Sequence, residues 1–426
     1  MSFAFVIFLV SFFYFIIVGY PIALNLLTSS IIYLLIEQYP LLMTIQRVFA
    51  GASSFALLTV PFFVFMGQLL LKGKALEDLT EFVNSFFGHV KGALALVVVG
   101  TCLLMGSIVG LAVAEAASLG SFLIPTMKKE GYKPAFCSAI MATGSLLGPI
   151  MPPGVLMIIY AVSVGRTSIA GLFLAAMIPA FLIALAQMLV IIYRAKKENY
   201  PSYTRKKWPE KYQQLKKALP ILLLPVVILG LIFANICTVT EASAIGCLYS
   251  LILTVLIKKN IKLKDFKEIF VETAATSGLI IILVGAGTVV SWIVANERII
   301  YSLIDPLSDL PAWGFLLIVN ILLLINGMLM DDAASVVIWG PIIAPIAWKL
   351  GIDPLHIGAI VCINLVIGLA TPPFGIALFV TSPIAGVKIE ETFKEAFPLI
   401  LATIGVLALV TYIPQITLFL PRLLGY

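Results

Sequence analysis

The sequence predicts an all-α polytopic membrane protein, built as an inverted repeat with two re-entrant helical hairpins and two broken helices. Three observations support this fold class. Of the 426 residues, 61% are hydrophobic and only 11% are charged, which is unlike the composition of soluble globular proteins. Apolar runs of about 20 residues recur along the chain, each long enough to cross the hydrocarbon core. Two of these runs contain a Pro-Pro pair, and the two pairs lie in corresponding places of the two halves.

The first 91 residues are expected to form the scaffold helices of the first repeat. Met1–Tyr20 has no basic start and no small-residue cleavage site, so we expect a retained membrane helix and no cleaved signal peptide. Pro21–Ile36 and Leu57–Leu71 are the next apolar spans, and residues 37–47 between them are expected to lie outside.

Residues 92–168 are expected to hold the first hairpin and the first broken helix. The apolar stretch Gly92–Met127 has a lysine at each end, which places both ends in the cytoplasm. Its middle contains Gly106-Ser107-Ile108-Val109-Gly110. Two ordinary spans also fit, but each would have only about 17 residues, at the short end of the range. A re-entrant hairpin that opens to the cytoplasm is therefore the preferred interpretation.

The next apolar stretch, Pro134–Ser163, is broken at Gly148-Pro149-Ile150-Met151-Pro152-Pro153-Gly154. Paired prolines remove two backbone donors and prevent helical bonding, while glycines tolerate the bend. Free backbone groups at membrane depth must be buried in protein or line a wet cavity. Such a break is typical of a binding site near the bilayer midplane.

The segment 169–218 is expected to contain one membrane span, Ser168–Tyr193, which is followed by a solvated cytoplasmic linker between the halves. The linker is strongly basic, and basic loops remain in the cytoplasm. Its cations are Arg194, Lys196, Lys197, Arg205, Lys206, Lys207, Lys211, Lys216 and Lys217.

The second half is expected to repeat this order. Scaffold helices occupy 219–313, with spans at Leu219–Ile236, Glu241–Ile257 and Glu268–Asn296 and an outer segment at 298–311. The second hairpin and broken helix occupy 314–393, and one C-terminal helix at Phe397–Leu420 falls in 394–426. The hairpin is expected to turn within residues 326–332 and to open to the outside, and the helix break to follow at Thr371-Pro372-Pro373-Phe374-Gly375.

A constant offset of 220 residues relates the helix breakers of the two halves, which indicates an internal duplication. The matched pairs are Pro125 and Pro345, Gly131 and Gly351, Pro134 and Pro354, Gly148 and Gly368, Pro152 and Pro372, and Pro153 and Pro373. One copy enters the membrane from the cytoplasm and the other from outside, so the repeat is inverted, as in several carriers with alternating access. The alternative is an old duplication that is kept only for packing.

Broken helices and hairpin tips expose backbone carbonyls and amides at membrane depth. Carbonyl, hydroxyl and amide oxygens suit Na⁺, and half-helix N-termini favour an anionic group. A single Ser or Thr here is more often a packing hydroxyl, but these residues group at both breaks. The Na⁺ candidates are Gly106, Ser107, Gly110, Thr143, Ser145, Gly148, Asn326, Asp331, Asn364, Gly368 and Thr371; the substrate or helix-break candidates are Pro152, Pro153, Pro372, Pro373, Glu115 and Glu241.

Four acidic residues lie within apolar stretches, where acids are costly and usually functional. Asp331 is the preferred cation ligand, and Asp332 is the weaker candidate. Glu115 is expected to cap or neutralise a helix N-terminus beside the first tip. Glu241 follows Thr238-Val239-Thr240, so capping and a role in the site remain equally open for it.

Enzyme and nucleic-acid functions are poorly supported. The chain has no G-x-x-x-x-G-K-[ST] loop and no G-x-S-x-G, and neither His89 nor His356 belongs to an H-E-x-x-H motif. The net charge of +6 comes from basic residues in short loops, which is typical of topology determinants. The five cysteines include no C-x-x-C, and we expect buried inert thiols. Transport driven by an ion gradient is therefore the function class that the sequence supports.

Four ordered segments resemble the large membrane (M) subunit of tripartite ATP-independent periplasmic (TRAP) transporters. They are Ala112–Gly120 with Pro125, Met127, Gly131 and Tyr132; Gly148–Pro153 with Ile159 and Tyr160; Thr238–Ala242; and Gly327, Met328, Asp331, Gly351–Pro354, Asn364, Gly368, Thr371–Pro373, Leu378 and Phe379. The resemblance covers nearly the whole chain. It implies an elevator-type carrier with Na⁺ as coupling ion and organic acid anions as substrates, of the C4-dicarboxylate or sialic acid type.

The resemblance also implies two partners, a small four-helix membrane Q subunit and a periplasmic substrate-binding protein, in the bacterial inner membrane. The sequence departs from the family at Leu111, where a small hydroxyl residue is usual, and at Gly154, where serine is usual. These departures leave the first cation site in question, or move it to backbone carbonyls. Two alternatives stay open: an ion-coupled carboxylate or oxyanion carrier that needs no binding protein, and a structural subunit without transport.

Overall fold

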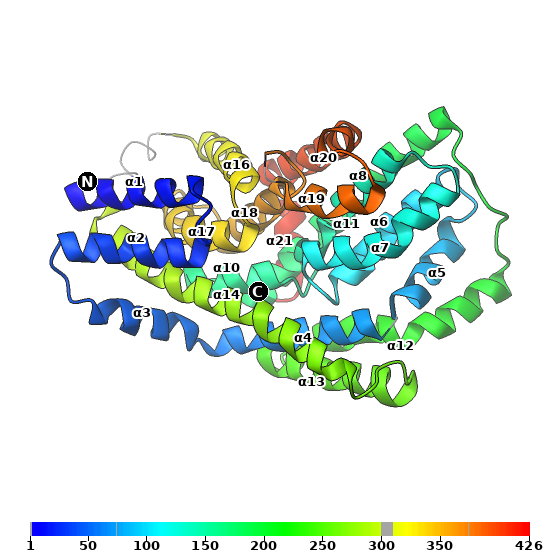
Figure 1. Cartoon of the computed structure of the whole chain (residues 1–426), viewed down its shortest axis with the longest axis horizontal. Coiled ribbons are helices and arrows are strands. Elements are labelled where there is room, and N and C mark those ends of the chain that lie inside the picture. Colours follow the sequence, from blue (N-terminus) through cyan, green and yellow to red (C-terminus); the bar gives the residue numbers. More distant parts are fainter. Residues whose placement is uncertain (1, 74, 300–309, 374) are drawn as a thin grey trace.

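The computed structural model describes residues 2–73, 75–299, 310–373 and 375–426, and every regular element within those ranges is a helix (Figure 1). The predicted all-α fold is confirmed. In the part of the chain that the structure describes, seven helices are long and apolar enough to cross a membrane, and the bent pair 134–150 and 155–164 makes an eighth. Parts of the predicted outer segment 298–311, and Phe374 in the second break, lie outside the described residues.

The first half runs from α1 to α11. The helices are α1 (Phe3–Ile17), α2 (Ile22–Ile36), α3 (Leu42–Ala52), α4 (Thr59–Lys72), α5 (Ala75–Phe87), α6 (Ala93–Gly106), α7 (Ala112–Lys129), α8 (Pro134–Gly144), α9 (Leu147–Ile150), α10 (Val155–Val164) and α11 (Ile169–Glu198). The short turn Phe55–Leu58 leads into α4. α6 and α7 form the first hairpin, and α8 to α10 form the first broken helix, with a 46° bend before α10.

The second half runs from α12 to α21. The helices are α12 (Trp208–Phe233), α13 (Val239–Leu251, continued by the π-helical turn Ile252–Ile257), α14 (Asp265–Asn296), α16 (Ala312–Leu329), α17 (Asp332–Lys349), α18 (Pro354–Gly368), α19 (Ile376–Ala385), α20 (Ile389–Tyr412) and α21 (Pro414–Leu423). α16 and α17 form the second hairpin, and α18 and α19 form the second broken helix.

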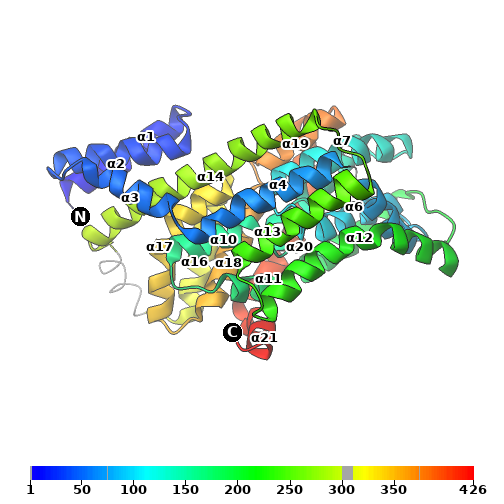
Figure 2. The same ribbon diagram turned by 90° about the horizontal axis from the view of Figure 1, so that it is seen from below.

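The helices sort into two packed groups. The hairpins and broken helices pack with α11, α20 and α21, whereas α3, α4 and α14 pack together and α12 packs on α5 and α13 (Figure 1). Figure 2 shows the long helix α14 running beside α4 along much of the molecule. α14 also contacts α17 and α10, and α5 contacts α6, so α14 and α5 both lie at the border between the groups. We call α1–α5 and α12–α14 the scaffold group and the remaining helices the hairpin group.

The apolar composition of the central helices follows from their position. All residues of α18 from Leu355 to Gly368 are buried, and so are nearly all residues of α6. A helix that is hydrophobic on every side is typical of complete enclosure by other helices. α6 of the first hairpin and α18 of the second broken helix therefore form the packed centre of the hairpin group.

The duplicated breakers have the same structural roles in both halves. Gly131 and Gly351, which follow α7 and α17, have φ of +86° and +76°, where a glycine avoids the strain that a side chain would cause. Pro134 and Pro354 are the first residues of α8 and α18, where the missing N–H costs no hydrogen bond. The Pro152–Pro153 and Pro372–Pro373 peptide bonds are both cis. The internal repeat is thus visible in the backbone.

The prediction of one C-terminal helix at 397–420 is wrong in its bounds. α20 begins at Ile389 and ends at Tyr412, and α21 starts at Pro414. Ile413 between them is not helical, with φ −122° and ψ 82°. Proline disfavours the helical conformation of the residue before it and has no N–H to donate, so the chain breaks there.

The prediction of a long solvated linker is also only partly right. Helices extend into it from both sides, so only residues 199–207 connect α11 to α12. Tyr200 is buried and stacks on Tyr132, with ring centroids 4.4 Å apart. The backbone N–H of Tyr203 donates to the carbonyl of Gly88 at 2.8 Å. The start of the connection is therefore docked onto the protein.

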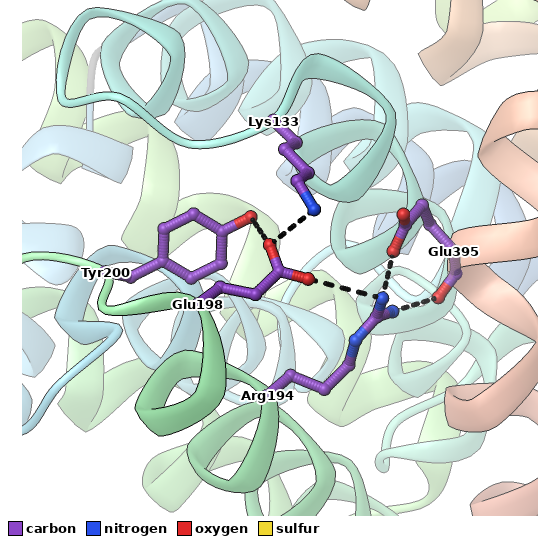
Figure 3. A network of polar contacts seen from close by, with 5 residues as sticks. All are labelled: Lys133, Arg194, Glu198, Tyr200 and Glu395. Atoms are coloured by element: carbon purple, nitrogen blue, oxygen red, sulfur yellow. Dashed lines mark hydrogen bonds and ion pairs between the residues drawn. The ribbon is translucent and has the colours of Figure 1, made fainter.

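A polar network holds this end of α11 in place (Figure 3). Glu198 accepts hydrogen bonds from the Tyr200 hydroxyl at 2.7 Å and pairs with the Lys133 ammonium at 2.9 Å. Burial and the hydrogen bond to Glu198 raise the pKa of Tyr200 well above its usual range, so its hydroxyl remains a donor. Arg194 pairs with Glu395 of α20 at 2.5 Å and lies 5.0 Å from the ring centre of Phe136. The network joins the start of α8 to α11 and α20.

Replacing Arg194 with alanine is expected to lower the free energy of unfolding by about 2 kcal/mol, because it leaves the half-buried Glu395 without its charged partner. The thermal midpoint of the purified protein measures this. Arg205→Ala, in the exposed part of the same connection, is the control and should leave the midpoint unchanged. Equal midpoints for both variants would contradict a stabilising role for the network.

Candidate functional site

A cavity of about 400 Å³ lies where the two halves of the chain meet. Both hairpin tips and both helix breaks reach it, and α14 of the scaffold group supplies the remaining wall. Its lining residues are Gly110, Leu111, Ala112, Val113, Ala114, Ala117, Pro149, Val155, Leu156, Ile159, Thr276, Leu279, Ile280, Asp331, Asp332, Ala333 and Leu369. A cavity of this size suits a small organic molecule.

The first hairpin tip packs directly against the first break. A Cβ on Gly106 would lie 2.8 Å from the Leu147 carbonyl oxygen and 3.0 Å from the Gly148 Cα atom. A Cβ on Gly148 would in turn lie 2.9 Å from a carboxylate oxygen of Glu115. The sequence-predicted residues Gly106, Gly148 and Glu115 therefore come together, and glycine is required for the close approach.

The second half repeats this contact. A Cβ on Gly327 would lie 3.2 Å from the Gly368 Cα atom, and a Cβ on Gly368 would overlap the Gly327 backbone at 2.2 Å from its carbonyl carbon. The tip of each hairpin is thus fixed to the break of its own repeat by a pair of glycines. This places both tips at the cavity.

Glu115 has an unusual environment for a carboxylate. Its side chain is 0% exposed, and neither carboxylate oxygen has a hydrogen-bond partner among the described residues. A buried polar group without a partner is costly, and a buried charge more so. The carboxylate therefore needs a bound cation or a proton to be stable at this position.

The hydroxyl groups predicted near the first break are already engaged with the backbone. Ser107 donates to the Leu104 carbonyl at 2.6 Å, Thr143 to the Ala139 carbonyl at 2.9 Å, and Ser145 to the Ala142 carbonyl at 3.0 Å. Such bonds leave the oxygen lone pairs free for a cation. Leu111 and Gly154 carry no hydroxyl, so the side-chain oxygens near the first tip and break are these three hydroxyls and the carboxylate of Glu115.

The amides predicted in the second half join the second hairpin to the second broken helix. The Asn326 amide donates to the Ser335 hydroxyl across the hairpin at 2.6 Å. The Asn364 amide donates to the Asn320 side-chain oxygen at 2.7 Å, while its own oxygen is buried without a partner among the described residues. Thr371 donates to the Ile367 carbonyl at 3.1 Å. The free oxygen of Asn364 is available as a cation ligand.

Asp331 and Asp332 stand at the tip of the second hairpin and line the cavity. Asp331 is the N-cap of α17, and one of its carboxylate oxygens accepts a hydrogen bond from the Ala333 N–H at 3.1 Å. Asp332 accepts from the same N–H at 2.8 Å. The N-terminus of α17 is therefore already neutralised by side chains, which is the usual function of an aspartate in this position.

The N-termini of α7 and α10 differ, because no side chain caps them. The N-cap residues are Leu111 and Gly154, the two positions where the sequence lacks a hydroxyl, and neither makes a side-chain cap bond. The first residues of both helices line the cavity. The helix dipoles favour an anion on this side of the cavity, and the first turn of α7 also carries the buried carboxylate of Glu115.

Glu241 does not line the cavity. It forms a capping box at the start of α13, where its carboxylate accepts from the Thr238 N–H and hydroxyl, both at 2.8 Å, and its own N–H donates to the Thr238 hydroxyl at 3.3 Å. Of the two roles left open by the sequence, the structure therefore shows the cap.

Replacing Glu241 with alanine is expected to reduce the thermal midpoint slightly, because two hydrogen bonds of the cap are lost, and to leave uptake per folded molecule unchanged. Thr238→Ala removes the other half of the box and should have the same effect. Loss of uptake with an unchanged midpoint would instead place Glu241 in the transport mechanism.

Sequence reasoning missed the wall that α14 provides. Thr276, Leu279 and Ile280 line the cavity from the middle of a 32-residue helix. This part of the helix contains no proline and no charged residue. No local signal distinguishes these residues from a lipid-facing surface.

Paired hairpins, paired helix breaks and a cavity between the two halves define a membrane transporter with an internal repeat. A family model described as "Tripartite ATP-independent periplasmic transporter, DctM component" matches residues 9–416. The chain belongs to this family, which comprises transporter permeases and is not an enzyme family.

Two curated relatives agree with this assignment, and a solved structure shares the fold. The chain is 36% identical over 413 residues to the sialic acid TRAP transporter large permease protein SiaM of Vibrio cholerae, covering 96% of each chain. It is 35% identical over 381 residues to the C4-dicarboxylate TRAP transporter large permease protein DctM of Pseudomonas aeruginosa, covering 89% of each. The structure of Neisseria gonorrhoeae MtrF, titled as one of a class of antimetabolite efflux pumps, matches 87% of this chain and 83% of its own with a TM-score of 0.59. At 15% identity this last likeness concerns the fold alone.

Proposed function

We propose that this protein is the permease subunit of a Na⁺-coupled secondary importer of organic acid anions that depends on a binding protein. The main observation is the cavity at which both hairpin tips, both breaks and α14 meet. Its partners would be a small four-helix Q subunit and a periplasmic substrate-binding protein, in a bacterial inner membrane.

The substrate carboxylate would bind at the N-termini of α7 and α10. Both helices begin at the cavity without a side-chain cap, so their first N–H groups are free to donate to an anion. The N-terminus of α17 is unsuitable, because Asp331 and Asp332 already occupy it. The anion therefore binds on the side of the first hairpin.

The coupling Na⁺ would bind at two places. Beside the second tip, Asp331 and the free oxygen of Asn364 are oxygen donors of the kind that Na⁺ prefers, together with carbonyls around Gly327 and Gly368. Beside the first tip, Glu115 supplies two oxygens without partners. A Na⁺ at each tip would remove the cost of burying these carboxylates.

Transport would follow an elevator mechanism in which the hairpin group moves against the scaffold group. The cavity supports this, because its walls belong to the hairpin group except for α14. Movement along α14 would carry the site from one side of the membrane to the other without dismantling it.

The test is uptake of labelled succinate, sialic acid and hexanoate into vesicles that contain the permease and its Q partner. Uptake that needs both a Na⁺ gradient and the binding protein is the expected result. Uptake by the permease alone would favour a carrier that works without a binding protein. Absence of uptake for all three acids in folded, correctly inserted protein would contradict the proposal and favour a subunit without transport.

Replacing Glu115 with glutamine is expected to raise the Na⁺ concentration for half-maximal uptake at least about tenfold, a free-energy change of about 1.4 kcal/mol. Glutamine keeps the shape of the side chain beside Gly148 and removes its charge. The measurement is the Na⁺ dependence of uptake at saturating substrate. Unchanged Na⁺ dependence would show that the carboxylate is not a Na⁺ ligand.

A further inference from the structure

We infer that the substrate is a monocarboxylate with a largely hydrocarbon body, such as a short aliphatic or aromatic acid; this rests on the proposed function. The carboxylate lies at the N-termini of α7 and α10, and the apolar body fills the remaining cavity. Three properties of the cavity support this: the nature of its walls, its supply of hydroxyl groups, and the sign of its charged side chains.

The walls of the cavity are almost entirely apolar. Large aliphatic side chains come from the first hairpin, from α10, from α14 and from the second break. They include Leu111, Leu156, Ile159, Leu279, Ile280 and Leu369. A hydrocarbon body displaces water from these surfaces, which is favourable in proportion to the apolar area that both partners bury.

Few side chains in the cavity can satisfy substrate hydroxyls. Thr276 is the single side-chain hydroxyl among the described lining residues, and the other polar side chains are Asp331 and Asp332. Leu111, at the start of α7, lines the cavity without a hydroxyl. A polyhydroxylated acid would therefore bury several hydroxyls without partners, and each carries a desolvation cost.

The charged side chains oppose a second substrate carboxylate. The described lining residues include two aspartates and no lysine, arginine or histidine. The uncapped N-termini of α7 and α10 serve the first carboxylate, while a second one at the opposite side would approach Asp331 and Asp332. Like charges in an apolar cavity repel more strongly than they do in bulk water. One bound Na⁺ at Asp331 leaves the charge of Asp332 compensated only by the N-terminus of α17, so dicarboxylates are disfavoured.

Three acids with six carbon atoms separate these features while keeping chain length constant. Hexanoate has one carboxylate and an apolar chain, adipate has two carboxylates, and gluconate has one carboxylate and five hydroxyls. Their dissociation constants are measured by calorimetry on the purified permease at saturating Na⁺. The binding protein is left out, so that only the selectivity of the permease is observed.

Hexanoate is expected to bind at least about tenfold more tightly than either adipate or gluconate. Equal or tighter binding of adipate or gluconate would overturn the inference and leave the proposed import of organic acids intact. Absence of binding for all three acids to folded permease would overturn the inference, and the proposed import of organic acids would be contradicted as well only if uptake with the Q partner and the binding protein also failed.

A pair of variants tests the wall itself. Leu111→Ser places a hydroxyl at the start of α7, and we expect it to reduce the preference for hexanoate over gluconate about fivefold or more. Phe122→Ser is the matched control, because Phe122 lies on the same helix with 36% of its surface exposed and does not line the cavity. An unchanged preference in folded Leu111→Ser protein would contradict the assignment of this wall to the substrate body.

Discussion

Replacing Gly368 with alanine is expected to abolish uptake and to destabilise the protein by more than about 4 kcal/mol. The new Cβ would lie 2.2 Å from the carbonyl carbon and 2.4 Å from the carbonyl oxygen of Gly327. These are backbone atoms of the second hairpin, so no side-chain rotation can relieve the overlap. The hairpin tip would have to move away from the helix break, and the cavity and the second cation site would be lost together.

Expression, the thermal midpoint and uptake measure this effect. The control is Gly405→Ala in α20, where an added Cβ meets no atom within 4 Å and alanine has the better helix propensity. Gly405→Ala should express and transport normally. A normal midpoint for Gly368→Ala would contradict the close packing of Gly327 on Gly368, and with it the fixed position of the second tip.

Replacing Asp331 is expected to raise the Na⁺ concentration for half-maximal uptake, and two substitutions separate the ligand role from the cap. Asparagine is as good an N-cap as aspartate, so Asp331→Asn should keep the start of α17 and remove only the charge. Alanine removes the cap as well, which costs about 1 kcal/mol. Both variants should require at least about tenfold more Na⁺, while only Asp331→Ala should show a lower thermal midpoint.

The measurements are the midpoint of each variant and the Na⁺ concentration for half-maximal uptake. If Asp331→Asn retains the Na⁺ dependence of the natural protein, Asp331 is a cap and the cation must depend on Asn364 and backbone carbonyls. If both variants lose stability to the same extent, the carboxylate charge contributes to the hairpin itself.

The positions of the breaks were predictable because prolines and glycines act locally. Pro152–Pro153 and Pro372–Pro373 interrupt their helices at the expected residues, and the 220-residue offset places matching breakers in matching roles. A missing N–H or a positive φ has the same consequence whatever surrounds it. Both hairpins and the all-helical membrane fold follow from these signals and from the apolar runs.

The bounds of other elements were less predictable, because packing competes with polarity. The basic segment after Arg194 suggested a free linker, yet Tyr200 stacks on Tyr132 and Glu198 pairs with Lys133. The sequence predicts only that residues 37–47 lie outside, whereas Leu42–Ala52 forms the helix α3, which packs along α14. In both cases contacts with residues far away in the sequence decide the local structure.

The sequence by itself determined the membrane class, the duplication, the two hairpins and the two breaks, because each depends on composition or on the backbone chemistry of single residues. The tertiary structure alone decided that Glu115 is sealed against Gly148 without a partner, that Glu241 caps a helix away from the cavity, and that α14 closes the site with Thr276, Leu279 and Ile280. These features depend on which surfaces meet when helices distant in sequence pack together. Because the hydrophobic effect is non-directional, the sequence of a uniformly apolar helix does not indicate which of its faces will contact which neighbour.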